Sequence, residues 1–268
     1  MEPALRLEGV TCTFPARSGS AAYTAVEGVN LDVGNGEFVA VVGPTGCGKS
    51  TLLNVASGLA APSRGRVVMF GQPMQGIDPR AGYLFQNEAL MPWRTALQNV
   101  TAGLEFRGVG AEEAGDLARR WLARVGLTGH AEKYPHELSG GMRKRVALAQ
   151  TLILDPKILL MDEPFSALDV QTRSLMENEL LGLWAQDRKS VVFVTHDLEE
   201  AIALADRVVI MSAGPSARII GDWRVPLPRP RDIAEIRMEK DFHALHREIW
   251  SVLKDEVMKG YAQSAEAV

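Results

Sequence analysis

The feature that most constrains the fold of this chain is a run of eight residues, Gly43-Pro44-Thr45-Gly46-Cys47-Gly48-Lys49-Ser50. The run fits the glycine-rich phosphate-binding pattern, in which a tightly turned backbone directs its N–H groups toward phosphate oxygens. A continuous apolar segment, Phe38–Val42, comes directly before the run, and apolar residues at helical spacing follow it as far as Leu59. A buried strand, a glycine loop and a helix in that order predict the start of a parallel sheet flanked by helices.

The last residues of the run indicate phosphate chemistry. We expect the Lys49 ammonium to neutralise the terminal phosphates of a nucleotide and the Ser50 hydroxyl to ligate Mg²⁺. The helix that begins near Gly48 adds the positive end of its dipole at the same place. An ordinary strand-to-helix turn has no need of Lys-Ser at its end. Cys47 lies inside the loop, and the helix start should lower the pKa of its thiol, so that oxidation or alkylation would block the site.

A second candidate element is the apolar segment Ile158–Met161, which ends in two acids. Carboxylates beside a core are costly unless a partner compensates their charge, and a bound Mg²⁺ is such a partner. Asp162 is then expected to help hold the metal, and Glu163 to orient and deprotonate an attacking water. The competing interpretation is a strand whose acids simply lie at its solvent end.

The order of strand-like and helix-like segments predicts an α/β core with a helical insertion. Helical periodicity dominates from about Asn87 to Gln150, and strand-like runs lie on both sides of it. The clearest strand-like runs are Leu5–Val10, Val29–Val33, Ile158–Met161, Val191–Thr195 and Arg207–Met211, and the clearest helical ones are Glu112–Val125 and Arg143–Leu154. Near the C-terminus an amphipathic helix is expected around residues 242–257, which either packs back on the domain or binds a partner.

Composition argues against several classes of protein. The net charge of −4 and the pI near 5.8 disfavour a nucleic-acid binder, whose affinity depends on neutralising phosphates. Two cysteines are too few for a disulfide framework and fit a reducing cytosol. The apolar runs are far shorter than the ~18 residues that a spanning helix needs. We therefore expect a cytoplasmic protein that reaches a membrane only through a partner.

A third motif carries a family resemblance. Leu138-Ser139-Gly140-Gly141-Met142 stands just before a predicted helix, where a serine and two glycines form either an anion site or a plain helix cap. The string resembles the signature motif of ATP-binding-cassette (ABC) ATPases. Gln86, the Ser166-Ala167-Leu168-Asp169 stretch and His196 resemble the Q-loop, D-loop and switch histidine of that family. Six motifs therefore occur in family order over most of the chain.

The resemblance implies an α/β fold with a P-loop NTPase (RecA-like) core, an inserted α-helical subdomain and N-terminal antiparallel β strands. It implies an ABC ATPase domain over residues 1–230, with the helical subdomain at about 87–150, and a C-terminal helical extension over residues 231–268. The implied cofactors are ATP and Mg²⁺. The implied enzyme is an ATPase that works as a head-to-tail homodimer, with ATP held between the phosphate loop of one subunit and the signature motif of the other.

Roles for individual residues follow from the same resemblance. The expected catalytic residues are Glu163, His196, Gln86 and Lys49, and the expected metal-binding residues are Ser50, Gln86 and Asp162. The expected ATP-binding residues are Phe14, Gly43, Pro44, Thr45, Gly46, Cys47, Gly48, Lys49, Ser50, Thr51, Ser139, Gly140, Gly141 and Asp169. The three signature residues would clamp the γ-phosphate held by the opposite subunit, and Asp169 would communicate across the dimer.

Two positions depart from a simple match with the family. An early aromatic residue stacks on adenine in these proteins, and Phe14 matches best by position, with Tyr23 as the alternative and core packing as the competing interpretation for either. Met142 stands where many members have glutamine, which leaves the serine and the glycines to contact phosphate.

The apolar stretch Asn87–Arg94 resembles the same region of bacterial nitrate, sulfonate and taurine importer ATPases. That resemblance implies transmembrane permease subunits as partners, a substrate-binding protein as an indirect partner, and a peripheral location on the inner face of the cell membrane. No nucleic-acid partner is expected. The alternative is a soluble ABC ATPase that acts on a partner other than a transporter, and the transported solute stays open.

Overall fold

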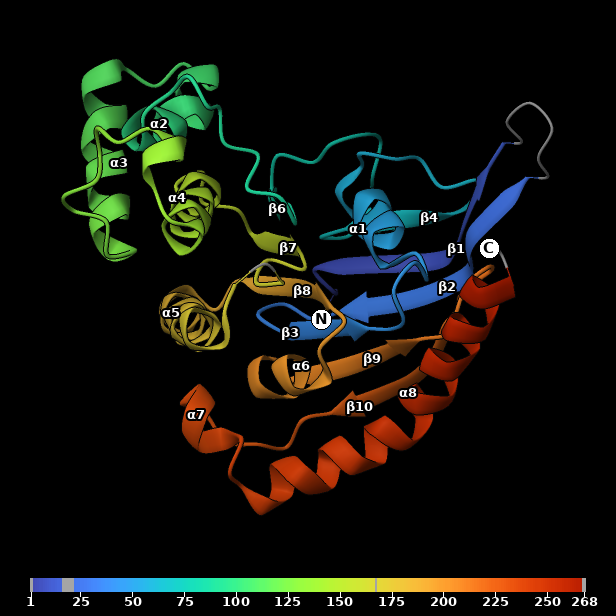
Figure 1. Cartoon of the computed structure of the whole chain (residues 1–268). Coiled ribbons are helices and arrows are strands. Elements are labelled where there is room, and N and C mark those ends of the chain that lie inside the picture. Colours follow the sequence, from blue (N-terminus) through green and yellow to red (C-terminus); the bar gives the residue numbers. More distant parts are fainter. Residues whose placement is uncertain (1, 16–21, 167, 267–268) are drawn as a thin grey trace.

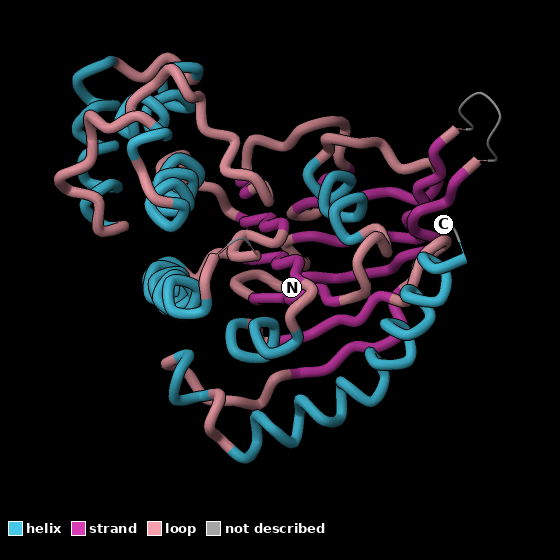
Figure 2. The backbone as a smooth tube through the Cα atoms, viewed as in Figure 1, coloured by secondary structure: helices cyan, strands magenta, loops and turns pink. Residues whose placement is uncertain are grey.

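The computed structural model of this chain describes residues 2–15, 22–166 and 168–266. Ala167, in the expected D-loop, and all residues between Pro15 and Ala22 lie outside the described residues. Figures 1 and 2 show strands in the middle of the molecule, helices on both sides of them, and a group of helices set apart at one end. This is the α/β arrangement expected from the sequence.

The main sheet has six strands in the order β10-β9-β3-β8-β7-β6. The pairs β9–β3, β3–β8, β8–β7 and β7–β6 are parallel, and only the edge pair β10–β9 is antiparallel. Its strands are β3 (Phe38–Val42), β6 (Ala81–Leu84), β7 (Ile158–Asp162), β8 (Ser190–Thr195), β9 (Arg207–Met211) and β10 (Ile219–Arg224). Every residue of β3, β7 and β8 is buried, as the continuous apolar runs predict.

A second, antiparallel sheet has the order β2-β1-β4-β5. Its strands are β1 (Leu5–Phe14), β2 (Tyr23–Val33), β4 (Arg64–Met69) and β5 (Gln72–Pro73). The strands β1 and β2 are longer than the apolar runs predict, because both continue past the covered core into an exposed hairpin end. Their pairing contains register irregularities between Leu7 and Thr13, which interrupt the regular alternation of side chains between the two faces.

Eight α-helices complete the described part of the chain. They are α1 (Lys49–Ser57), α2 (Ala96–Phe106), α3 (Ala111–Arg124), α4 (Gly140–Leu152), α5 (Val170–Asp187), α6 (Leu198–Leu204), α7 (Ile233–Ile236) and α8 (Lys240–Glu266). Helix α1 ends at Ser57, two residues before the last apolar residue at helical spacing, because Gly58 adopts a φ of 79°. A β-carbon at Gly58 would lie 2.0 Å from the carbonyl oxygen of Gly76, so no larger residue fits this turn.

Apolar side chains cover both faces of the main sheet. Successive residues of β3 point to opposite faces: Val39 and Val41 pack with α1, β1 and β2, while Phe38 and Ala40 pack with α5, α6 and α8. Helices α2, α3 and α4 enclose a separate cluster of their own, which includes Val100, Leu122 and Val146 among its members. This group is the set of helices that stands apart in Figure 1.

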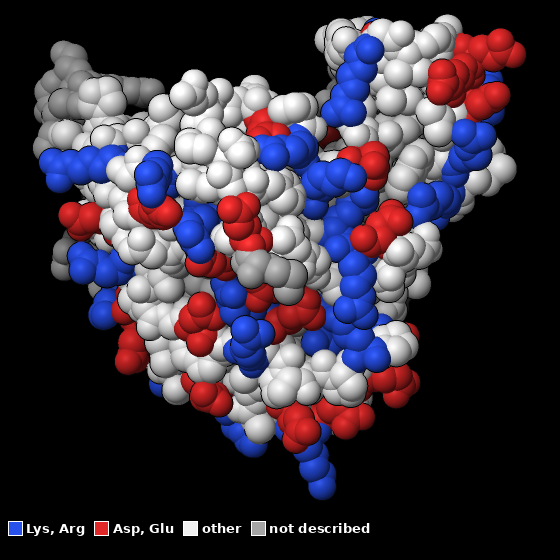
Figure 3. Space-filling model, turned by 180° about the vertical axis from the view of Figure 1, so that it is seen from behind, with Lys and Arg blue, Asp and Glu red and all other residues white. Residues whose placement is uncertain are grey.

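The C-terminal helix α8 packs back on the domain, as one of the two sequence interpretations proposed. Phe242, Leu245, Ile249 and Leu253 are buried in the cluster that also holds α6 residues. In Figure 1, α8 runs along the β9–β10 side of the sheet toward the end of the β1–β2 hairpin. No helix among the described residues is both long and apolar enough to cross a membrane. On the face seen in Figure 3, basic and acidic side chains lie interspersed.

One buried acid in this core has an unusual ionisation. Glu200 of α6 is 4% exposed and accepts a hydrogen bond from the Thr195 hydroxyl at the end of β8. Burial raises the pKa of Glu200 to about 8. The carboxyl therefore stays protonated in the folded protein at a pH where an unfolded chain has already lost that proton.

We predict that Glu200→Gln flattens the decline of stability with rising pH. Between the ordinary pKa of 4.5 and the raised value of about 8, the folded state binds a proton that the unfolded state lacks. The free energy of unfolding therefore falls by up to about 1.4 kcal/mol per pH unit in that window. Urea unfolding of wild type and variant between about pH 5 and pH 8 measures this slope. Equal slopes would contradict the assignment.

Candidate active site

The phosphate loop joins β3 to α1, as the motif predicts. Gly46 and Gly48 adopt positive φ angles of 78° and 97°. A β-carbon at Gly48 would lie 2.8 Å from Cγ1 of Val26, so the close packing of the loop on β2 requires glycine there. No side chain caps the first turn of α1. Its N–H groups therefore face the loop, where a phosphate oxygen can accept from them.

Lys49 extends back over the loop from the first position of α1. Its side chain is 5% exposed, and its Nζ donates to the carbonyl oxygens of Gly43 at 2.9 Å and Pro44 at 3.1 Å. The same Nζ lies 3.9 Å from Oε1 of Glu163. A buried ammonium held over a glycine loop is placed to bind an anion that the loop binds.

Asp162 and Ser50 form a polar pair beside the loop. The Ser50 hydroxyl donates to Oδ1 of Asp162 at 3.0 Å, and Asp162 is 7% exposed. Burial raises the pKa of Asp162, with Glu163 acting in the same direction, while the Ser50 hydrogen bond and the Lys49 charge oppose it. A carboxylate in this position gains from a cation nearby.

The oxygen donors of this pair suit Mg²⁺, which prefers hard oxygen ligands and commonly takes several of them from phosphates and water. Over residues 2–15, 22–166 and 168–266, no three His, Cys, Asp or Glu side chains gather as a complete metal site. With Ser50 and Asp162 as protein ligands, a magnesium ion here would take further oxygen ligands from phosphate and water.

Glu163 is the centre of the site. It follows β7 directly with a positive φ of 43°, uncommon for a residue with a side chain. Its Oε2 lies 3.0 Å from Nδ1 of His196, which follows β8, and accepts from Nε2 of Gln86 at 3.5 Å. Lys49 lies near its other oxygen. Glu163 itself follows β7, and its three neighbours come after β3, β6 and β8, so side chains from four strands of the main sheet meet here. A carboxylate with such neighbours can accept a hydrogen bond from a water molecule and then take its proton.

One residue that sequence reasoning missed supports the Q-loop. Lys144 of α4 is 3% exposed, and its ammonium donates to the carbonyl oxygen of Gln86. Burial lowers the pKa of Lys144. The contact links residues 58 positions apart, and a lysine in a helix ordinarily faces water, so nothing in the local sequence marks it.

The signature residues lie elsewhere. Ser139 caps α4, its hydroxyl accepting from the Met142 N–H at 3.3 Å, as a helix cap would. A β-carbon at Gly141 would lie 2.8 Å from Cγ2 of Thr172, so the start of α4 packs against the start of α5. Within the described residues, no hydrogen bond or ion pair joins the side chains of Ser139–Gly141 to the phosphate loop. A single chain thus leaves its signature apart from its own loop.

Asp169 and Thr51 occupy supporting positions. Asp169 caps α5, its carboxylate accepting from the Thr172 N–H at 3.0 Å, and this hydrogen bond lowers its pKa. Thr51 follows Ser50 in α1 and is partly exposed. Both remain predicted site residues.

The two aromatic candidates for adenine stacking are cross-strand neighbours. Phe14 pairs with Tyr23 at the end of the β1–β2 hairpin, and the two are 48% and 46% exposed, which excludes core packing for both. A β-carbon at Gly214 would lie 3.5 Å from the Tyr23 hydroxyl and 3.5 Å from the carbonyl oxygen of Gly46. The Tyr23 hydroxyl and the carbonyl oxygen of Gly46 thus both lie near Gly214.

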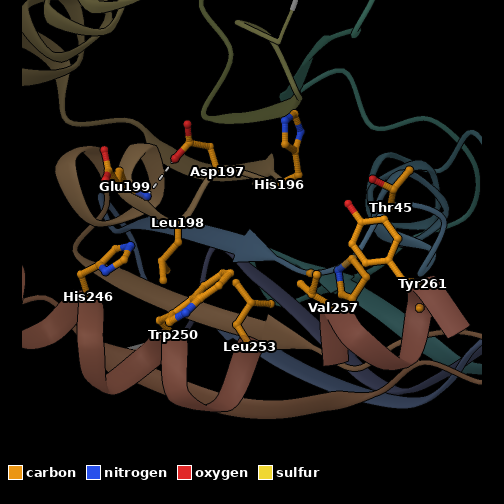
Figure 4. A pocket seen from close by; sticks show the side chains of 13 residues that line it. Thr45, His196, Asp197, Leu198, Glu199, His246, Trp250, Leu253, Val257 and Tyr261 are labelled. Atoms are coloured by element: carbon orange, nitrogen blue, oxygen red, sulfur yellow. Dashed lines mark hydrogen bonds between the residues drawn. The ribbon is translucent and has the colours of Figure 1, made fainter. Parts of the chain in front are cut away.

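A groove of about 560 Å³ lies between the phosphate loop and α8. Figure 4 shows Thr45 and His196 on one side of it and Trp250, Leu253 and Val257 of α8 on the other. Gly260 of α8 approaches the loop closely, since a β-carbon there would lie 3.4 Å from Cβ of Pro44. The C-terminal helix is thus part of the surroundings of the loop, which its sequence did not indicate.

The prediction for the thiol of Cys47 is wrong. Cys47 is 1% exposed, and burial raises its pKa, outweighing the nearby Lys49 charge and the backbone N–H groups. Its sulfur points into the core and only its backbone takes part in the loop: Cys47 packs in the cluster with Val41 and Leu52. The sequence rule for helix starts failed because it ignores burial.

We predict that Cys47 does not react with thiol reagents in the folded protein. Cys12 is also buried, so a disulfide reagent should titrate no thiol rapidly under native conditions and both thiols after unfolding. The measurement is the absorbance of the released thiolate with and without denaturant. Rapid native labelling that a Cys47→Ala variant abolishes would show that the thiol is accessible.

Comparison with known protein sequences identifies clear similarities. The family described as ABC transporter matches residues 26–166. An uncharacterised ABC transporter ATP-binding protein of Methanocaldococcus jannaschii is 44% identical, and the match covers 97% of this chain and 94% of that protein. A bicarbonate transport ATP-binding protein of Synechococcus elongatus is 42% identical, with coverages of 91% and 88%. A nitrate import ATP-binding protein of the same organism is 43% identical, with coverages of 85% and 83%.

Solved structures show the same similarity. A dimeric post-hydrolysis state of an ATP-binding cassette, bound to ADP and Pi, is 32% identical to this chain and has a TM-score of 0.73. The match covers 84% of this chain and 100% of that chain. A dimeric structure of a bacterial ABC transporter cassette has a TM-score of 0.74 at the same identity.

Proposed function

The chain belongs to the ABC transporter family of ATP-binding proteins, and on that premise we propose that two copies hydrolyse ATP between them and thereby drive a membrane permease. The observation that carries the proposal is the division of the site within one chain. Lys49, Glu163 and His196 meet at the phosphate loop, while the signature residues lie against α5 instead. A second copy packed head to tail would bring its signature to this loop and complete the site.

Nucleotide binding uses the loop and its neighbours. The phosphates of ATP would accept from loop N–H groups and from Lys49, and the adenine would lie against the hairpin end. Phe14 and Tyr23, which pair across this end of the hairpin, are the two candidates for its stacking partner. Ser50 and Asp162, with Gln86 nearby, would hold Mg²⁺, which would neutralise developing charge on the phosphates.

Hydrolysis would use the Glu163 cluster. Glu163 would take a proton from the attacking water as the bond between that water oxygen and the γ-phosphorus forms and the bond to the ADP oxygen breaks. His196, 3.0 Å from Glu163, would contact the γ-phosphate and orient the carboxylate. Gln86, 3.5 Å from Glu163, would hold the same water. Signature N–H groups of the opposite subunit would compensate the remaining negative charge.

ATP then acts as a switch. Its charges are compensated fully only when both subunits contribute, so ATP binds the closed dimer in preference to the open one. Loss of the γ-phosphate removes this preference and lets the subunits separate. The permease would follow this motion and open alternately to each side of the membrane.

A second groove offers a place for the permease. It has a volume of about 290 Å³ and lies between β6, the Q-loop, α2 and α4. Phe85 and Phe106 line it and are 43% and 83% exposed. Exposed aromatic residues beside a groove indicate a protein partner. A short helix of a transmembrane subunit would fit there, next to Gln86, and would place the chain on the inner face of the membrane.

The transported solute is proposed from relatives alone. Those named above include bicarbonate and nitrate transport proteins, which supports a small solute, with nitrate inside the nitrate, sulfonate or taurine class that the sequence resemblance implies. Contacts with the solute would lie in the permease and in a substrate-binding protein.

We predict that Glu163→Gln retains ATP binding but lowers the hydrolysis rate at least about 100-fold, because the amide cannot accept the proton of the attacking water. The variant should therefore accumulate as a dimer when ATP is present. Light scattering after gel filtration, with ATP and without it, measures the dimer, and phosphate release measures turnover. Hydrolysis at the wild-type rate would refute Glu163 as the base, and a monomer in ATP would refute the dimer.

We predict that Phe106→Glu weakens recovery of a permease from native membranes, because a charge in the groove opposes an apolar helix. The tagged Glu163→Gln protein, with ATP, is the bait in detergent-solubilised membranes, and mass spectrometry identifies the partners. Met238→Glu is the matched control, since Met238 is 79% exposed and does not line the groove. Recovery of soluble partners alone would favour an ABC ATPase that works outside transport.

A further inference from the structure

One side chain bridges the two turns that carry the reacting groups of the proposed site. Glu163 begins the turn after β7, and His196 lies in the turn after β8. Arg173 lies near the start of α5 and donates two hydrogen bonds of 3.3 Å each. One goes to the carbonyl oxygen of Leu168 in the turn after β7, and the other to Oδ2 of Asp197 in the turn after β8. A planar guanidinium can hold such a pair of acceptors in a fixed relative position.

Hydrogen bonds within the turn after β7 connect Leu168 to Glu163. The Ser166 N–H and its hydroxyl donate to the carbonyl oxygen of Glu163 at 3.3 and 3.0 Å. The Leu168 N–H donates to the carbonyl oxygen of Phe165 at 3.1 Å. A shift of the Leu168 carbonyl would therefore act on the hydrogen bonds within the turn that Glu163 begins.

The second turn is held through Asp197, which directly follows His196. One carboxylate oxygen of Asp197 caps α6, accepting from the N–H groups of Glu199 at 2.9 Å and Glu200 at 3.2 Å. The other oxygen faces Arg173. Figure 4 shows Asp197 between His196 and the start of α6. Because both oxygens are engaged, Asp197 holds the backbone of the turn that carries His196.

Arg173 belongs to a larger cluster of charges, in which Glu177 is fully buried and the two arginines are partly exposed. Glu177, one helical turn further along α5, is 0% exposed and accepts from Nη2 of Arg237 at 3.2 and 3.3 Å. The Nε atoms of Arg173 and Arg237 are buried without a hydrogen-bond partner. Such groups cost stability. Arg237 lies in the same cluster, but among the described contacts its side chain donates only to Glu177 and to neither turn. A substitution of Arg237 therefore reports the loss of stability alone, without a change in the position of Glu163 or His196.

We propose that Arg173 is a positioning residue for ATP hydrolysis: it keeps Glu163 and His196 in one relative geometry by holding both turns. The inference rests on the proposed function, because it takes Glu163 as the base and His196 as its partner. A misplacement of reacting groups by about 1 Å costs on the order of 100-fold in rate. Nucleotide binding, in contrast, depends on the phosphate loop, with which Arg173 makes no contact recorded among the described residues.

The test is steady-state ATP hydrolysis by Arg173→Gln, with Arg237→Gln as the matched control. Arg173→Gln should lower kcat by about 10- to 100-fold and leave KM and the affinity for a fluorescent ATP analogue within about twofold. Arg237→Gln should lower the melting temperature and leave kcat within about twofold. Equal losses of kcat in the two variants, or a loss that lies in KM, would overturn the inference.

A double-mutant cycle tests the bridge itself. Asp197→Asn keeps a side chain that can cap α6 but removes the charge that faces Arg173. The double variant Arg173→Gln/Asp197→Asn should be little slower than either single variant, since all three break the same link. Additive losses would overturn the inference. If Arg173→Gln fails to fold, Asp197→Asn alone must show the loss in kcat at unchanged KM.

The Glu163→Gln variant separates this inference from the proposed function. If that variant hydrolyses ATP normally, the base assignment is wrong whatever Arg173 does. If it is inactive and Arg173→Gln behaves like Arg237→Gln, only the positioning role is refuted.

Discussion

The candidate site depends on the parallel pairing of β3 with β8 and of β8 with β7. In this register Val42 lies beside Thr195, and Asp162 lies beside Val194. The three strands therefore end at the same level, and the residues that follow them leave the sheet at one edge. The phosphate loop, His196 and Glu163 are neighbours for this reason, although more than a hundred residues separate the loop from either of them.

The same strand pairing determines which apolar and polar groups must be buried. Strands buried on both faces need apolar cover from two directions, and the two clusters around β3 supply it. The cost appears at the strand ends, where Lys49, Asp162 and Glu200 are buried among polar partners instead of water. Each of these groups is compensated by a neighbour from another element. Burial of polar groups at the carboxyl ends of the strands costs free energy, and the contacts that offset this cost hold the side chains in place.

Two parts of the molecule connect this edge to the rest of the chain. Helix α4 presents the signature at its start and holds the Q-loop through Lys144 within its body. Helix α5 is capped by Asp169 and holds both reacting turns through Arg173. The starts of these two helices touch at Gly141 and Thr172. In the proposed dimer, a second subunit that displaced the start of α4 would therefore displace the start of α5 as well.

The sequence by itself determined the features that depend on near neighbours in the chain. Continuous apolar runs determined the buried strands, and the phosphate loop and its helix follow from local turn chemistry. The motif residues Lys49, Glu163, His196 and Gln86 lie together in the structure. Burial of the Cys47 thiol, the Lys144 contact and the Arg173 bridge were decided only by the tertiary structure. Each depends on desolvation or on contacts between residues far apart in sequence, and local patterns carry no information on which distant group will cover a side chain.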